Sequence, residues 1–337
     1  EVRLQKFLLV LMMKNIFIFS SGELKREGNT LCFESSQGKK FVPVASVSSL
    51  YIFGEVSLNK KLLEFVSENH ITLHFFNYYG FYTGSYIPRA HYSSGFIILK
   101  QVEHYLDKIK RLELAKKFVY GGAMNMIKVL KYYENENLSG LIRTLDQLIK
   151  LIDSSDSIES LMALEANIRE NYYSGFNHII NVDDMKFYGR ERRPPKGPLN
   201  ALISFGNGLL YATVLGEIYK THLDPRIGYL HSTNFRKFSL NLDVAEVFKP
   251  IITDRVIFTL INRGEINLSD FNKELGGTYL IEKGRIKFLK EFNDRLNQTI
   301  TLERRKLSYQ TLIRAELYKI EKHIMQEKEY FPYISQW

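Results

Sequence analysis

The chain has 337 residues, enough for one large domain or two moderate ones, and its hydrophobic fraction of 45% is that of an ordinary globular protein. Lys and Arg (46) outnumber Asp and Glu (37), which gives a net charge of +9 and suits a polyanionic partner such as nucleic acid without requiring one. The single cysteine, Cys32, excludes a disulfide framework within the chain and a cysteine-based zinc site. It is also typical of a reducing compartment, so we expect a cytoplasmic location.

The beginning of the chain is predicted to be a small β domain. No apolar run reaches the roughly 20 residues that span a bilayer, so we expect no membrane association. Residues 1–12 are expected to be an upstream extension, because a start at Met13 would lead directly into a strand-like sequence. From 13 to 88, short runs rich in β-branched and aromatic residues alternate with turn signals, which predicts a mainly antiparallel β domain. One helix is expected over 58–68, with Ser57 as its N-cap.

After a linker over 89–95, the hydrophobic period changes to that of helices. Leu141, Leu145, Leu148 and Ile152, for example, recur at spacings of 4, 3 and 4. The residues from 96 to 337 are therefore predicted to form a larger all-α domain, which makes the fold class α+β. Its helices are expected over 101–120, 141–152, 161–173, 199–219, 242–262 and 302–326.

Glu165 is the first candidate site residue, because it lies in the middle of an apolar helical stripe. Leu161, Ile168 and Tyr172 are at i−4, i+3 and i+7 from it. A carboxylate that faces a packed surface must be paired, protonated or bound to a cation. A plain salt bridge to Arg169 at i+4 is the alternative to a metal ligand.

The second group of candidates lies between 228 and 250. Asp243 and Glu246 are three residues apart and share one face of a helix that begins near Leu240, although acids in a first turn also complement the helix dipole, and Ser239 offers a simple cap. His231 follows an apolar turn, where a lone histidine is more often a hydrogen-bonded core residue than a ligand. Together, a Glu, a His and an Asp/Glu pair make a mixed oxygen and nitrogen site that suits Mg²⁺ or Mn²⁺.

Basic residues flank these candidates. The loop over 189–198 carries two prolines that would reduce the entropy lost on clamping a phosphate backbone, but a solvated loop is an equal alternative. The candidate DNA contacts are Arg190, Arg193, Lys196, Arg236, Lys237 and Lys249.

Five stretches, taken in order, resemble the integrase of CRISPR adaptation, the universal first-numbered Cas nuclease that installs new spacers. The resemblance extends from about Met13 to Tyr333, and its specificity comes from the ordered set and its separations. The stretches are LEANIRENYY (164–173), RRPPKGPLNALISFG (192–206), LDPRIGYLH (223–231), SLNLDVAEVFKP (239–250) and YLIEKGR (279–285).

The resemblance implies a site, a cofactor and partners. Glu165, His231 and Glu246 would be the metal ligands for Mg²⁺ or Mn²⁺, with Asp243 as a neighbouring catalytic carboxylate. The family works on double-stranded DNA as a homodimer, and two dimers flank a small ferredoxin-fold companion protein. Two departures stand out: Ala166 is found where the family usually has Gly, and Lys249 where Arg is frequent.

The functional hypothesis is a metal-dependent DNA integrase and endonuclease of CRISPR adaptation. It would insert short DNA fragments into a repeat array by attack of a 3′-hydroxyl on a phosphodiester, and cleave DNA, including branched forms, with water. Two alternatives remain. The first is a non-catalytic basic DNA-binding scaffold, in which the acids are caps and salt bridges; the second is a stand-alone nuclease for branched DNA.

Overall fold

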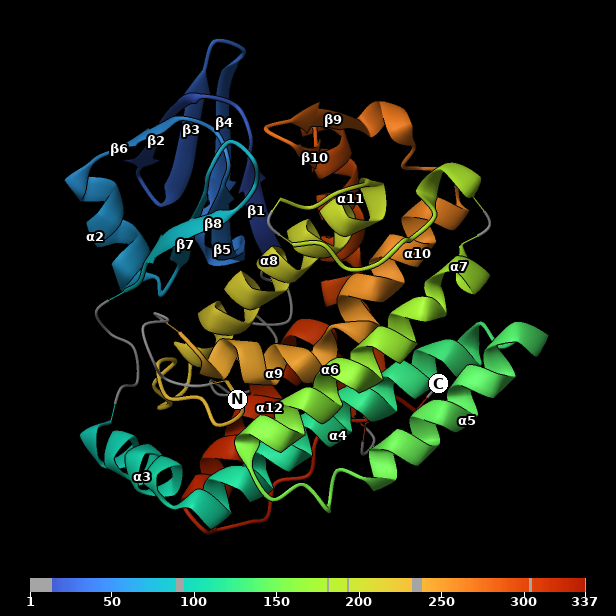
Figure 1. The fold of residues 1–337 in the computed structure, drawn as a ribbon. Helices are drawn as coiled ribbons and strands as arrows, with labels where there is room; N and C mark the ends of the chain where they lie inside the picture. Colours follow the sequence, from blue (N-terminus) through green and yellow to red (C-terminus); the bar gives the residue numbers. More distant parts are fainter. Residues whose placement is uncertain are drawn as a thin grey trace. The chain divides into compact units, whose positions relative to one another are not determined.

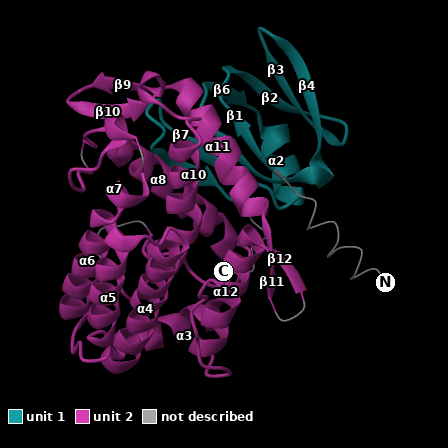
Figure 2. Cartoon of the chain, turned by 90° about the vertical axis from the view of Figure 1, so that its right-hand side faces the viewer, with its two compact units in different colours: residues 1–92 teal, residues 93–337 magenta. Residues whose placement is uncertain are grey.

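The computed structural model describes residues 14–88, 94–180, 182–192, 194–231, 238–302 and 305–336 (Figure 1). The chain divides into two compact units, residues 1–92 and 93–337 (Figure 2). The first unit is rich in strands and the second is mostly helical, so the predicted α+β class is confirmed. The expected extension over 1–12 and residues 89–93 of the expected linker lie outside the described residues.

The first unit contains two four-stranded sheets among its described residues. One has the order β4-β3-β2-β6 and the other β1-β5-β7-β8. The pairs β1–β5, β5–β7 and β2–β6 are parallel, so the prediction of a mainly antiparallel domain was wrong in this detail. Strands that pair across an intervening segment can run parallel, an arrangement that local turn signals do not reveal. The strands are β1 (Lys14–Ile18), β2 (Gly22–Glu27), β3 (Thr30–Ser35), β4 (Gly38–Pro43), β5 (Val47–Ile52), β6 (Val56–Leu58), β7 (Thr72–Phe76) and β8 (Tyr82–Tyr86).

The helix of the first unit is α2 (Lys60–Glu68), and its apolar face packs into the core of this unit. Leu62, Phe65 and Val66 are buried there, and each such side chain contributes about 1.5–3 kcal/mol by leaving water. The N-cap is Asn59, whose side chain accepts a hydrogen bond from the backbone N–H of Leu62. The prediction of Ser57 as the cap was wrong, because this residue lies in β6.

The second unit contains helices and two short hairpins. The predicted all-α domain is therefore mostly rather than wholly helical, and the helix expected over 302–326 begins only at Tyr309. The consecutive β-branched residues Thr299, Ile300 and Thr301 favour a strand, which explains the second hairpin. The helices are α3 (Gly95–Leu106), α4 (Lys108–Tyr132), α5 (Glu136–Lys150), α6 (Ile158–Ser174), α7 (Phe176–Ile179), α8 (Pro198–Ile218), α9 (Leu240–Phe248), α10 (Arg255–Asn262), α11 (Glu282–Asn297) and α12 (Tyr309–Ile324). The hairpins pair β9 (Phe271–Glu274) with β10 (Gly277–Leu280), and β11 (Thr299–Leu302) with β12 (Arg305–Ser308).

Helix α8 has the length and apolar composition of a membrane span, but 83% of its apolar window is buried inside the protein. It packs against α9 and α12, which is the environment of a core helix. Among the described residues, no other helix meets the same length and composition test.

Helix α4 is packed by α5, α6 and α9, so it connects the two helices that carry the candidate acids (Figure 1). Gly122 lies where α4 meets α9: a Cβ there would be 2.9 Å from the backbone oxygen of Glu246. Glycine is required at this position because a backbone oxygen cannot move aside as the end of a side chain can.

The single helix expected over 242–262 is interrupted. A short π-helix, Pro250–Asp254, separates α9 from α10. Pro250 has no N–H to donate to Glu246, and its ring would clash with that carbonyl in a regular α-helix. The chain widens instead, and the N–H of Asp254 donates to the carbonyl of Lys249, five residues earlier, at 3.0 Å.

Candidate metal centre

Two of the predicted acids converge on one guanidinium. Glu165 lies on α6 and Glu246 on α9, and Nη2 of Arg169 donates to a carboxylate oxygen of each. Nε of Arg169 also donates to Oε1 of Glu165 at 2.7 Å. The side chains of Glu165 and Glu246 are 20% and 6% exposed, so this is a largely desolvated cluster rather than a surface ion pair. The predicted salt bridge between Glu165 and Arg169 is confirmed, but it is one half of a bridge to Glu246.

Glu246 has two cationic partners and stays ionised in spite of its burial. Burial alone would raise the pKa of this carboxyl, but the charges of Arg169, Lys249 and His231 lower it to about 2. Nζ of Lys249 donates to Oε1 of Glu246 at 2.6 Å and lies 4.9 Å from the centre of the Tyr211 ring.

Asp243 holds the main chain that carries His231. Its Oδ2 accepts the backbone N–H groups of Tyr229 at 2.5 Å and Leu230 at 3.1 Å, and its Oδ1 accepts the N–H of His231 at 3.0 Å. Gly228 makes this approach possible, because a Cβ there would lie 2.9 Å from Oδ2 of Asp243. The loop is therefore wrapped around one buried carboxylate.

The same carboxylate orients the imidazole. Nδ1 of His231 lies 2.8 Å from Oδ1 of Asp243, and since an ionised carboxylate only accepts, Nδ1 is the donor. Burial opposes protonation of His231, but the hydrogen bond and charge of Asp243, with the charge of Glu246, raise its pKa above the usual value. Nε2 is left to face outward from the carboxylate, the arrangement that fixes the tautomer of metal-binding histidines.

The two oxygens of Asp243 accept four hydrogen bonds, and its side chain is fully buried, so in this structure it positions His231. The role of Asp243 as a catalytic carboxylate stays a prediction. Ser239 was expected to cap α9, but its hydroxyl accepts from the N–H of Gly228 and donates to the carbonyl of Arg226 instead. Both residues bind the 226–231 turn.

A fourth acid, Asp254, lies at the end of the π-helix. Tyr172 donates to its Oδ2 at 3.1 Å, and burial raises the pKa of Asp254 to about 7, although Arg169 and this hydrogen bond act in the opposite direction. The sequence analysis missed this pair. The available signal was spacing: Tyr172 follows Glu165 by seven residues and Asp254 follows Glu246 by eight, so both continue the faces that carry the first two acids.

The family model described as CRISPR associated protein Cas1 matches residues 16–294 of the chain. The chain belongs to the Cas1 family. A protein of Thermodesulfovibrio yellowstonii named "CRISPR-associated endonuclease Cas1 2" is 52% identical over 97% of the chain and all of its own length. "CRISPR-associated endonuclease Cas1" of Thermotoga maritima is 44% identical over 94% of the chain and 98% of its own.

Solved structures agree with the Cas1 assignment. A Cas1 structure from Thermotoga maritima is 43% identical, covers 95% of the chain and all of its own, and superimposes with a TM-score of 0.87. A chain described as "Casposase bound to integration product" has a TM-score of 0.84 at 19% identity, over 95% of this chain and 93% of its own, and it shows the shared fold.

The basic residues predicted around the Cas1 site lie in different environments. Lys196 is 63% exposed, and its ammonium lies 2.9 Å from Glu191. Arg190 is engaged within the protein, since its guanidinium donates to Asn200, to Ser204 and to a backbone carbonyl. Lys249 is buried beside Glu246 and pairs with it, and its contact with DNA stays a prediction. Arg193, Arg236 and Lys237 lie outside the described residues.

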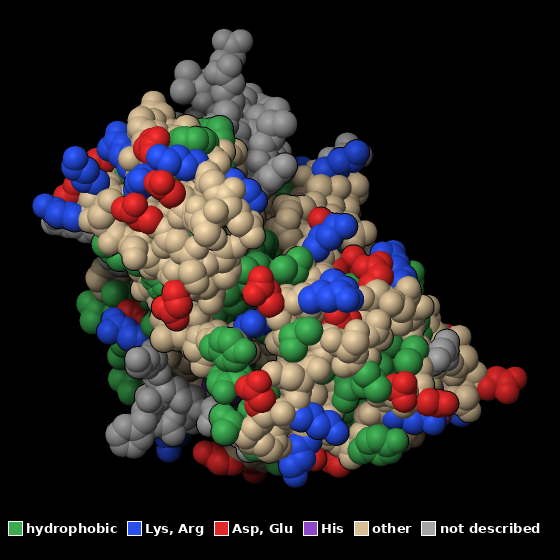
Figure 3. Space-filling model, turned by 90° about the horizontal axis from the view of Figure 1, so that it is seen from above, with side chains coloured by type: hydrophobic (Ala, Val, Ile, Leu, Met, Phe, Trp, Pro, Cys, Tyr) green, Lys and Arg blue, Asp and Glu red, His purple; other side chains and the backbone are tan. Residues whose placement is uncertain are grey.

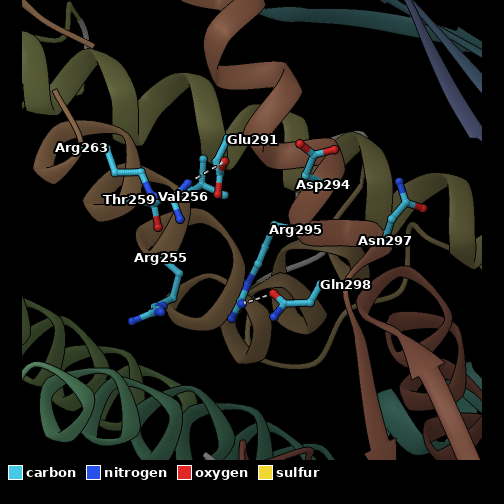
Figure 4. Close-up of a pocket in the computed structure, with 9 residues that line it drawn as sticks. All are labelled: Arg255, Val256, Thr259, Arg263, Glu291, Asp294, Arg295, Asn297 and Gln298. Atoms are coloured by element: carbon cyan, nitrogen blue, oxygen red, sulfur yellow. Dashed lines mark hydrogen bonds and ion pairs between the residues drawn. The ribbon is translucent and has the colours of Figure 1, made fainter. Parts of the chain in front are cut away.

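Three arginines, Arg255, Arg263 and Arg295, line a pocket of about 500 Å³ between α10 and α11 (Figure 4). The guanidinium of Arg255 lies 3.7 Å from the centre of the Tyr132 ring, and Arg295 donates to the carbonyl of Ile251. Arg263 approaches Glu291 at 3.9 Å. These contacts give the arginines structural roles.

The donor set fits a divalent cation. Two carboxylates from separate helices meet at a single positively charged nitrogen, and His231 is electrostatically coupled to Glu246. Over the part of the chain that the structure describes, no three His, Cys, Asp or Glu side chains already form a group that could hold a metal. In this structure the guanidinium of Arg169 pairs with both carboxylates.

Proposed function

We propose that the chain is a cytoplasmic, divalent-metal-dependent DNA endonuclease and integrase of CRISPR adaptation. The observation that carries the proposal is the convergence of Glu165 and Glu246 on one cation, together with an imidazole that Asp243 orients and whose pKa is raised in part by the charge of Glu246. Oxygen and imidazole ligands together suit Mg²⁺ or Mn²⁺. The names of the close Cas1 relatives, which are called endonucleases, support the same reaction class.

Each residue has a role in this proposal. Glu165, Glu246 and Nε2 of His231 would hold the ion, which when bound supplies Lewis-acid activation of the attacking oxygen and of the scissile phosphate. Asp243 keeps the imidazole in one tautomer and orientation. Lys249 keeps Glu246 ionised and in place. The nucleophile belongs to the substrates: a 3′-hydroxyl in integration and water in cleavage, on duplex and branched DNA.

The proposed partners are double-stranded DNA, a second copy of the chain and a small ferredoxin-fold companion protein. Solved chains with the same fold occur in structures described as "Cas6-RT-Cas1--Cas2 complex" and "Crystal structure of TtCas1-DNA complex". Of the predicted DNA contacts that the structure describes, Lys196 is the best placed to bind a phosphate backbone. Its ammonium is exposed, and its surface ion pair with Glu191 costs little free energy to replace with a phosphate contact.

The test compares two glutamates on the same helix. Glu165→Gln removes one proposed ligand, whereas Glu170→Gln changes an exposed residue on another face of α6. We expect Glu165→Gln to lower strand transfer of a short duplex into a repeat-bearing plasmid by more than about 100-fold. Loss of a residue that only hydrogen-bonds a metal ligand already lowers activity by up to about 100-fold, and loss of a ligand itself should cost more. Glu170→Gln should keep the wild-type rate.

Equal rates for the two folded variants would show that the site is assigned wrongly. Binding of DNA without cleavage or transfer in Mg²⁺ or Mn²⁺ would favour the non-catalytic scaffold. Cleavage of branched DNA without transfer, measured with the companion protein present, would favour the stand-alone nuclease.

A further inference from the structure

The contact that joins the two acids has a consequence for metal binding. One nitrogen, Nη2 of Arg169, donates to both Glu165 and Glu246. We propose that Arg169 is a built-in competitor of the divalent cation, so that the ion binds both carboxylates only when this guanidinium withdraws. The inference rests on the proposed function and adds a residue that controls occupancy of the same site.

The first argument is steric. A metal–oxygen bond to Mg²⁺ is about 2.0–2.1 Å long, whereas a charged N–H···O contact is about 2.7–2.9 Å. An ion bonded to the facing oxygens of Glu165 and Glu246 would have to lie in the space that Nη2 fills. The guanidinium and the ion therefore exclude each other.

The second argument is charge. The carboxylates of Glu165 and Glu246 carry two negative charges, and Arg169 and Lys249, which pair with them, carry two positive charges. The four side chains sum to zero, so an arriving divalent ion meets a neutral cluster instead of the net negative charge that attracts cations. Removing one positive charge at this short range would strengthen metal binding considerably in a desolvated cluster.

Arg169 cannot relieve the competition by losing its proton. Arginine stays charged in proteins at all ordinary pH values. Burial acts against the charged form of Arg169, but Glu246 and Glu165 raise its pKa well above the usual value. Movement of the side chain is the remaining way to admit the ion.

A purely structural role for Arg169 predicts the opposite result. If the guanidinium only holds the carboxylates in position for the metal, its removal separates them and weakens metal binding. If it competes with the metal, its removal strengthens metal binding while it destabilises the metal-free protein, because two largely buried carboxylates lose a partner.

The experiment is a Mn²⁺ titration of the full chain without DNA, with free Mn²⁺ measured by electron paramagnetic resonance. We expect Arg169→Gln to bind Mn²⁺ about tenfold more tightly than the wild type. We also expect it to melt at a lower temperature without metal, and Mn²⁺ to raise its Tm by more than that of the wild type. The matched control is Arg314→Gln, which breaks a different Arg–Glu pair, with the buried Glu217, and should leave Mn²⁺ affinity unchanged.

Arg169→Lys provides a second variant if the glutamine protein does not fold. It keeps the charge but lacks the fork that reaches two carboxylates, so we expect an affinity above that of the wild type. Mn²⁺ binding that depends on Glu246, as shown by Glu246→Gln, but that does not tighten in either Arg169 variant would overturn the inference and leave the proposed function standing. Absence of Mn²⁺ binding in the wild type and in every folded Arg169 variant would overturn both.

Discussion

Two acids on α9, three residues apart, bind different kinds of partner. Asp243 accepts hydrogen bonds from three consecutive backbone N–H groups and one imidazole, whereas Glu246 is held by the side chains of Arg169 and Lys249. Backbone donors fix geometry, since they cannot move without the loop. Charged side chains fix the ionisation state and can exchange partners. One turn of α9 therefore orients His231 through Asp243 and also presents Glu246, whose cationic partners can be exchanged.

Asp254 gives a prediction at the same scale. Because burial raises the pKa of Asp254 from 3.8 to about 7, the folded carboxyl keeps its proton between about pH 4 and 7 while the unfolded chain loses it. The unfolded state then binds fewer protons, so the free energy of unfolding must fall as pH rises through this window. Asn mimics the protonated acid and still accepts from Tyr172. We therefore expect wild type to lose up to about 1.4 kcal/mol per pH unit relative to Asp254→Asn.

Urea unfolding of both proteins at pH 5, 6 and 7 measures this difference. Shifts from other groups, including His231, occur in both proteins and cancel in the comparison. Parallel curves for the two proteins would contradict the prediction.

At the scale of elements, the contact between α4 and α9 determines where Glu246 lies. A Cβ at Gly122 would lie 2.9 Å from the backbone oxygen of Glu246, whereas a Cβ at Gly140, exposed on α5, would meet nothing within 4 Å. Gly→Ala inside a helix normally stabilises it by about 0.5–1 kcal/mol. We expect that gain for Gly140→Ala and a loss of about 1–3 kcal/mol for Gly122→Ala, because the two helices are forced apart.

Thermal and urea unfolding of the two variants check the opposite signs. A gain in both would mean that α9 adjusts freely, and Glu246 would then not depend on this contact for its position.

The helices and strands show which features local patterns can predict. Sequence patterns located α6 and α8 to within three residues: α6 carries spaced buried side chains, and α8 is a long apolar segment that is buried on nearly all sides. They did not detect the parallel strand pairs or the backbone groups that Ser239 contacts, because both depend on other segments of the chain. For the same reason, the spacing of Glu165 and Arg169 predicted their ion pair, but not that Glu246, 77 residues further along, would share it.

At the scale of the whole molecule, the net charge is +9. Figure 3 shows one face on which Lys and Arg side chains lie among Asp and Glu side chains. Binding of DNA on such a surface should depend on a few well-placed cations. The sequence alone could not select them, because charge in a loop does not reveal whether a guanidinium is engaged internally, as that of Arg190 is.

Salt dependence tests this view. We expect affinity for duplex DNA to fall at least about tenfold between 50 and 200 mM salt, as for about two or more phosphate contacts. Lys196→Ala should reduce the slope of log affinity against log salt by about 1, and Lys150→Ala, which changes an exposed residue at the end of α5, should not. Fluorescence anisotropy of a labelled duplex measures both slopes. An equal reduction of the slope in the two variants would contradict a specific contact between Lys196 and a phosphate.

The wide turn at Pro250–Asp254 also limits how the chain can change. It adds one residue to a helical ladder, so that everything after it is turned by about 100° compared with an uninterrupted α-helix. Restoring regular pitch with every residue kept, or inserting a further residue there, would rotate α10 as a rod and carry Arg255 away from the ring of Tyr132. Deleting one residue would instead remove the widening and leave α10 in place, so an insertion in this segment should be far more damaging than a deletion, even though no proposed metal ligand would be altered in either case.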